Sequence, residues 1–104
     1  MSIREFLLER IAEDELRANY YGPKAMGTAR VLAECEAKRA VIEQHGPGEG
    51  HYRDYCETCA EWWAAEIGEG PPGVRFPCPT LRAVAAAYSN HPDYQQEWAI
   101  GQHP

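Results

Sequence analysis

The sequence predicts an all-α fold, in which one small domain is built from four helices. Three observations lead to this prediction. Apolar residues recur at three- and four-residue steps along most of the chain, and glycine and proline pairs separate the periodic segments. Apolar and polar residues do not alternate over any stretch long enough to form a sheet. The 104 residues suffice for one domain, residues 1–104. Folding of a chain of this size buries roughly 65% of its unfolded surface, so the core is thin.

Residues 3–20 are predicted to form the first helix. Ser2 and Glu5 have the spacing of a capping box, in which each side chain pairs with a backbone N–H group of the first turn. Gly22-Pro23 ends the helix, because proline lacks a backbone donor and disfavours helix in the residue before it. The residues expected on the apolar face recur at helical spacing: Ile3, Phe6, Leu7, Ile11, Leu16 and Tyr20.

Residues 28–45 are predicted to form the second helix. Thr28 is the expected N-cap, and the Gly-Pro-Gly sequence after His45 ends the helix, so that His45 lies in its last turn. Glu34 and Lys38 are four residues apart, which predicts an ion pair on the solvent side. The apolar stripe is expected to contain Val31, Leu32, Cys35, Ile42 and His45.

A third helix is predicted over residues 55–67 and a fourth over residues 79–90. Asp54 and Glu57 form an N-cap pattern in front of the third helix. The glycine- and proline-rich stretch that follows it separates the two helices, and Pro79 is favoured as a first helical residue.

The residues after the fourth helix predict a turn and a folded-back tail. Pro92 fixes its own φ, and Asp93 can accept hydrogen bonds from the backbone just beyond it. Tyr94 and Trp98 are four residues apart, so a short helical tail would present them as one aromatic face. We expect this face to pack on the first two helices as a structural clasp. The alternative is an exposed partner site that includes His91.

Three cysteines indicate a metal site. Cys56 and Cys59, three residues apart in the first turn of the predicted third helix, would place both sulfurs on one side, where the helix dipole stabilises thiolates. Cys78 lies between two prolines and supplies a third sulfur. The candidates for the fourth ligand are Cys35, His45, His51 and His91.

We expect His45 to be the fourth ligand and the ion to be a structural Zn²⁺, which takes four Cys or His ligands tetrahedrally. His51 is a possible alternative in the loop before Cys56. Cys35 lies about 15 Å from His45 along the helix axis, so the two cannot bind the same ion, and Cys35 is expected to be a buried apolar residue. An iron–sulfur cluster on all four cysteines and a metal-free protein are the other interpretations. Redox activity of the two closely spaced thiols is disfavoured, since no strand precedes them.

Charge and hydropathy exclude several function classes. The formal charge is −6, with only two lysines, so a general nucleic-acid binder is not expected. No run approaches the roughly 20 apolar residues of a membrane span, and the N-terminus lacks the uncharged block of a signal peptide. A cytoplasmic protein without membrane partners is the expectation.

Several short sequence motifs, taken together, point to a family. They are Val31-Leu32-Ala33-Glu34, Cys56-x-x-Cys59, Cys78-x-Thr80-Leu81-Arg82 and Tyr88-x-x-His91-Pro92-Asp93-Tyr94-x-x-Glu97-Trp98. The chain resembles a family of small uncharacterised proteins of actinobacteria and their phages, a domain of unknown function. The resemblance implies that a histidine at the end of the second helix accompanies the paired cysteines, which favours His45 over His91. It implies no activity, and a cytoplasmic location in the host if the protein is phage-encoded.

The function expected from these features is that of a non-enzymatic protein-interaction or regulatory module. Trp62 and Trp63 are about 100° apart on a helix, so one of them should be partly exposed, where tryptophan often anchors an interface. The expected partner is another protein of unknown identity, and the sequence predicts no oligomeric state.

Two alternative functions are a zinc-dependent hydrolase and a zinc-supported DNA-binding protein. A hydrolase would use Glu57 or Glu61 as the base, but three thiolates make zinc a poor Lewis acid. A DNA-binding third helix would carry Glu57, Glu61 and Glu66 without a Lys or Arg, and phosphate would repel it.

Overall fold

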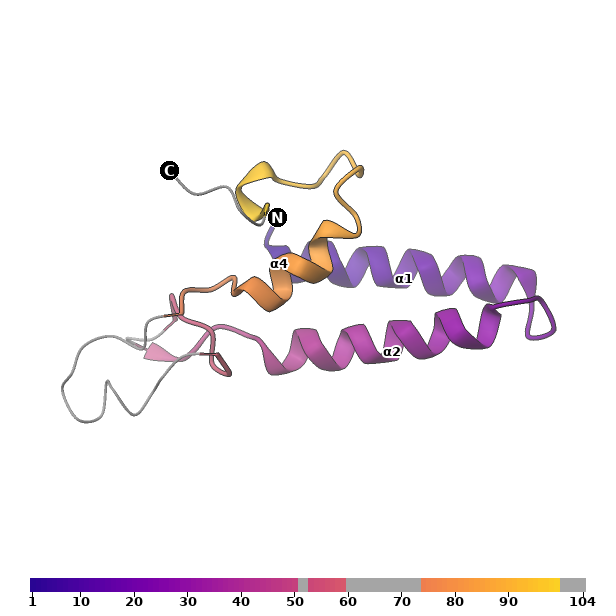
Figure 1. The fold of residues 1–104 in the computed structure, drawn as a ribbon, viewed down its shortest axis with the longest axis horizontal. Coiled ribbons are helices and arrows are strands. Elements are labelled where there is room, and N and C mark those ends of the chain that lie inside the picture. The colour runs from indigo at the N-terminus through magenta and orange to yellow at the C-terminus, as the bar shows by residue number, and fades with distance from the viewer. Residues whose placement is uncertain (51–52, 60–73, 100–104) are drawn as a thin grey trace.

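The computed structural model describes residues 1–50, 53–59 and 74–99. Its elements are helices α1 (Ile3–Tyr21), α2 (Thr28–Gln44) and α4 (Pro79–Ala86), and the short 3-10 helix η2 (Gln96–Trp98). Figure 1 shows α1 and α2 as an antiparallel hairpin, with α4 and the tail beside one half of it. The mostly helical fold predicted from the sequence is therefore confirmed, while the count of four helices is not.

Helix α1 begins where the sequence predicts and buries one face. The backbone N–H of Glu5 donates to Ser2 Oγ at 3.1 Å, which caps the first turn. Leu16 and Tyr20 were expected on the buried face, but they are 73% and 84% exposed. Ala18 is buried instead, because a residue two positions away lies about 200° around a helix. The buried residues of α1 are Ile3, Phe6, Leu7, Arg10, Ile11 and Ala18.

Helix α2 differs from the prediction at its start and in its ion pair. Gly27, not Thr28, is the N-cap: it adopts φ +85°, a left-handed conformation that glycine permits, and its carbonyl accepts from Val31. Glu34 pairs with Arg30 at 3.1 Å rather than with Lys38. Lys38 is drawn away because its Nζ donates to the hydroxyl of Tyr88 at 3.0 Å.

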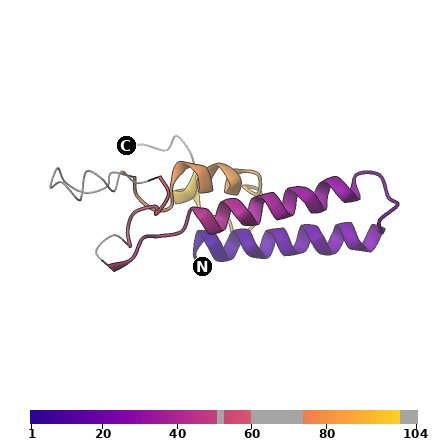
Figure 2. The same cartoon turned by 90° about the horizontal axis from the view of Figure 1, so that it is seen from below.

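Helix α4 is shorter than predicted and ends at Ala86. The next residues form turns, in which the amides of Tyr88 and Ser89 donate to carbonyls three residues back, those of Ala85 and Ala86. Figure 2 shows α4 lying on the side of the α1–α2 hairpin. The hydrophobic core is formed where these helices meet, by Ile3, Phe6, Leu7, Ile11, Cys35, Ile42, Cys56, Cys78, Leu81, Ala85 and Trp98.

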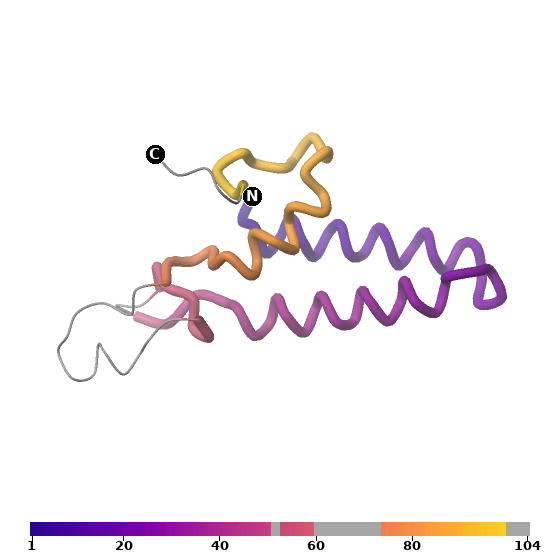
Figure 3. Tube along the Cα trace, viewed as in Figure 1, coloured from indigo at the N-terminus to yellow at the C-terminus, as the bar shows by residue number. Residues whose placement is uncertain are grey.

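The tail folds back onto α1, as Figure 3 shows. The ring of Phe6 lies among four rings from the end of the chain, with Trp98 nearest at 5.1 Å between centroids. The other three rings are those of Tyr88, His91 and Tyr94. Trp98 is 4% exposed, and the Gln95 side chain donates to the carbonyl of Met1. The predicted packing of the tail is therefore confirmed for α1, while its role as a clasp rather than a partner site stays a prediction.

Residues 55–59 do not form the predicted start of a third helix. Tyr55 and Cys56 lie in isolated β-bridges with Arg75 and Pro47, and residues 57–59 form a turn. An extended backbone is favoured over a helix here because it pairs with a neighbouring segment on either side, whereas the first turn of a helix leaves its N–H groups unpaired. Residues 60–67 of the predicted helix lie outside the described residues.

Candidate metal centre

Three segments that are distant in the sequence meet at one end of the hairpin. His45 is the C-cap of α2, Cys56 and Cys59 come from the bridge and turn at residues 55–59, and Cys78 is the N-cap of α4. In Figure 1 the end of α2 and the start of α4 approach this short segment at the same end of the molecule. Each donor residue thus stands at the boundary of an element, where the backbone can aim the side chain away from the element's axis.

Backbone hydrogen bonds hold the segment that carries Cys56 from both sides. On one side Glu57 N donates to Gly46 O at 2.9 Å, and Gly48 N donates to Tyr55 O at 2.8 Å. On the other side Cys56 N donates to Val74 O at 2.9 Å. The hydroxyl of Thr58 also donates to the carbonyl at the end of α2. These bonds bring the paired cysteines up to His45.

The four donor atoms have the spacing of a tetrahedral site. All of them lie within 4.8 Å of one another. His45 Nδ1 is 3.5 Å from Cys56 Sγ, 3.3 Å from Cys59 Sγ and 3.6 Å from Cys78 Sγ. A tetrahedral Zn²⁺ with bonds of about 2.3 Å to sulfur and 2.0–2.1 Å to nitrogen separates N and S donors by roughly 3.6 Å. The side chains therefore fit one such ion.

The cluster is buried or half-buried, and this burial affects the protonation of the Cys59 thiol. Cys56 and Cys78 are fully buried, and all four cysteines are free thiols. Burial, together with the hydrogen bond from Cys56 and the charge of Cys78, raises the pKa of Cys59 to about 11. The Cys59 thiol is therefore neutral unless a cation joins the cluster. A metal ion reverses this preference, because thiolates are its ligands and metal binding releases protons.

Comparison with known proteins places the chain in a family. The profile described as "Family of unknown function (DUF6221)" matches residues 21–100. The chain belongs to this family. The matched range includes all four residues of the cluster and the aromatic tail. No curated protein and no solved structure matches the chain.

This DUF6221 member therefore brings together the four residues that the sequence singled out as ligands: His45, Cys56, Cys59 and Cys78. Their role as ligands and the identity of the ion stay predictions. None of the helices in the described ranges is both long and apolar enough to cross a membrane.

The remaining candidates lie elsewhere. Cys35 is buried between α1 and α2, with its Sγ 3.9 Å from the carbonyl of Ile11, and burial raises the pKa of its thiol. His91 packs on Phe6 in the clasp. His51 lies outside the described residues, as do Trp62, Trp63, Glu61 and Glu66.

Sequence reasoning missed the role of Arg10. This arginine is 5% exposed on the core face of α1 and donates to the ring of His91, with Glu13 Oε1 3.0 Å from its guanidinium. The available signal was its position three residues after Leu7 and one before Ile11, within the apolar stripe. The guanidinium anchors the turn that begins the clasp.

Proposed function

We propose that this protein is a helical protein-interaction module stapled by one structural Zn²⁺, and that it catalyses no reaction. One observation carries the metal half of the proposal: His45 and three cysteines from three separate segments hold their donor atoms within 4.8 Å of one another. Structural zinc sites use this set of one nitrogen and three sulfur donors.

The donor set favours a structural ion over a catalytic one. Four protein ligands complete a tetrahedral shell, whereas a hydrolytic zinc keeps one position for water. Three thiolates also transfer so much charge to the ion that it polarises a substrate poorly. Two of the three sulfurs are fully buried, which supports a closed site. These properties argue for an architectural role.

The staple would hold together a part of the fold that has little else to stabilise it. Residues 54–59 contribute one fully buried side chain, that of Cys56, and no helix. Because the ligands come from α2, α4 and this segment, the free energy of metal binding becomes part of the free energy of folding.

The interaction half of the proposal is supported by the surface. The net charge of −6 disfavours phosphate-rich partners, and large apolar side chains are exposed at the far end of the α1–α2 hairpin. A protein partner fits both features. We further propose that the module acts in the cytoplasm of actinobacteria, or of the host where a phage encodes it.

Metal analysis of two matched variants tests the staple. We expect protein purified without a histidine tag to contain one zinc per chain, Cys78→Ser to lose stoichiometric zinc, and Cys35→Ser to retain it. Both cysteines are fully buried in the described core, so the pair separates loss of a ligand from loss of a buried thiol. Retention by Cys78→Ser, or release by Cys35→Ser, would show that the ligand assignment is wrong.

A further inference from the structure

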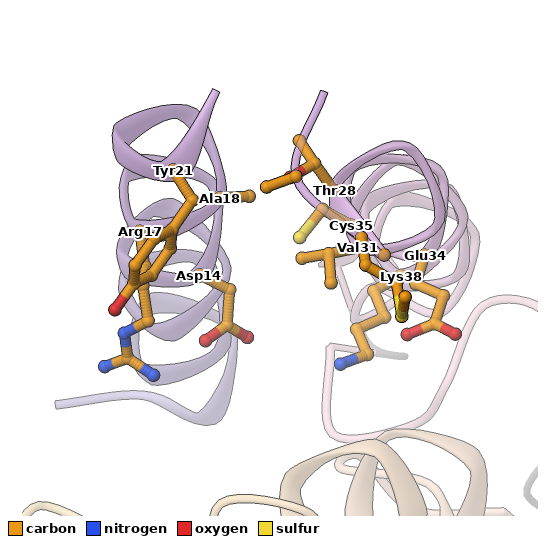
Figure 4. Close-up of a pocket in the computed structure, with 12 residues that line it drawn as sticks. Asp14, Arg17, Ala18, Tyr21, Thr28, Val31, Glu34, Cys35 and Lys38 are labelled. Carbon is orange, nitrogen blue, oxygen red and sulfur yellow. The ribbon is translucent and has the colours of Figure 1, made fainter. Parts of the chain in front are cut away.

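The α1–α2 hairpin is covered over only part of its length. Helix α4 and the residues after it cover the hairpin as far as Tyr88. The hydroxyl of Tyr88 donates to Asp14 at 2.8 Å and accepts from Lys38 at 3.0 Å, so that it bridges the two helices. Beyond this bridge a groove of about 500 Å³ lies between α1 and α2. Figure 4 shows Asp14 and Arg17 on the α1 side of this distal groove, and Glu34 and Lys38 on the α2 side.

Apolar side chains gather at the same end of the hairpin. The described residues expose six large hydrophobic side chains, and four of them lie between residues 16 and 26. These are Leu16, Tyr20, Tyr21 and Met26, of which Met26 is fully exposed. Such a cluster on a small protein typically marks an interaction surface, while single exposed residues do not.

The distal surface has a self-complementary shape. A second, shallower hollow lies on the outer side of α1, lined by Glu13, Leu16, Arg17, Tyr20 and Tyr21. Arg17 and Tyr21 line both hollows and therefore form a ridge beside the distal groove. A surface that pairs with itself about a twofold axis needs such a ridge next to a groove, since each copy must present both.

The charges of the distal groove also suit a second copy. The protein as a whole carries −6, yet the groove lining holds two acidic and two basic side chains, so the lining itself adds no net charge at the contact between two copies. Asp14 and Lys38 are engaged by Tyr88. Arg17 makes no ion pair within the described part of the chain, and Glu34 pairs only with Arg30, which is itself 85% exposed.

We propose that the distal groove is the docking site for a second copy of this chain, in a twofold dimer. The ridge of each copy lies in the groove of the other, and Arg17 approaches Glu34 of the partner subunit. Beyond Asp14 and Lys38 the uncovered stretch is about 10 Å long on α1 and about 15 Å long on α2 at 1.5 Å per residue, which is short for the roughly 800 Å² per partner of a standard interface. The dimer is therefore reversible and dissociates on dilution.

Analytical ultracentrifugation over a concentration series tests the dimer. Arg17→Glu and Glu34→Arg should each weaken association by about tenfold, and the double variant should restore it by exchanging the charges across the interface. Met26→Asp, which charges the apolar part of the surface, should also weaken it. Leu8→Gln, an exposed hydrophobic position outside the distal surface, is the matched control and should leave association unchanged.

A protein that stays monomeric at all concentrations overturns the dimer, and so does a double variant no better than the single ones. Binding of a different protein to the groove of a monomeric chain overturns it as well. The inference rests on the proposed interaction role, and zinc is measured in the same samples. A monomer with full zinc content would contradict the dimer and leave the metal staple intact.

Discussion

Two fully buried cysteines show how position decides what a residue does. Cys78 caps α4 and lies 3.6 Å from the imidazole of His45, whereas Cys35 faces the carbonyl of Ile11 between two helices. The Cys78 thiol lies close to three other donor groups, whereas Cys35 does not belong to this cluster. A thiol among other donors is placed to bind a metal ion, whereas an isolated buried thiol behaves as a small hydrophobic side chain.

The clasp provides a prediction at the residue scale. Trp98→Ala should destabilise the protein by about 3–5 kcal/mol, because it removes a large aromatic ring that packs on Phe6. In a chain of this size the melting temperature should fall by about 10 °C or more. Thermal unfolding followed by circular dichroism measures it.

The matched control for the clasp is Tyr20→Ala, measured in dilute solution. Tyr20 is an aromatic residue that is 84% exposed, so its loss should leave the melting temperature nearly unchanged. Equal shifts for Trp98→Ala and Tyr20→Ala would contradict the burial of the clasp.

At the scale of elements, the proposed staple predicts that the segment at residues 54–59 depends most on the metal. Removing the metal with a chelator should speed hydrogen exchange at the amides of Cys56 and Glu57, which donate to Val74 and Gly46. Amides in the middle of α1, such as that of Ile11, should exchange as before, because the α1–α2 hairpin contains no ligand in that region.

Hydrogen exchange resolved by NMR makes this measurement. Reloading the protein with zinc should restore the slow exchange of both amides. Unchanged protection of the Cys56 amide after full metal removal would contradict the dependence of this segment on the ion.

The elements also show which features sequence reasoning can reach. The bounds of α1 and α2 were predicted to within one residue at each end, because caps and breakers act locally. The helix expected from Asp54 and Glu57 was wrong over residues 55–59, since partners near residues 47 and 75 compete for the backbone there. Local spacing carries no information about those partners.

The site was more accessible to sequence reasoning than the surrounding chain. Cysteine and histidine have few roles, so the spacing of Cys56 and Cys59 and the position of His45 at a helix end were enough to choose among candidates. The exposure of Leu16 and Tyr20 was not foreseen, because helical periodicity alone does not show whether they or Ala18 continue the buried face of α1.

On the scale of the whole molecule, the two ends of the hairpin have different roles. At one end His45, the paired cysteines and Cys78 join three segments, and at the other end the distal groove lies open between α1 and α2. The clasp and α4 cover the part between them, as Figure 3 shows. Under the proposed function the staple would stabilise one end, and the far end of the hairpin would bind the partner.

We propose that one metal ion is bound by one nitrogen and three sulfur atoms. X-ray absorption spectroscopy at the zinc edge of the purified protein measures this donor set. We expect three sulfur ligands at about 2.3 Å and one nitrogen ligand at 2.0–2.1 Å, from the cysteines and His45. A shell of four sulfurs, or one dominated by oxygen, would contradict it.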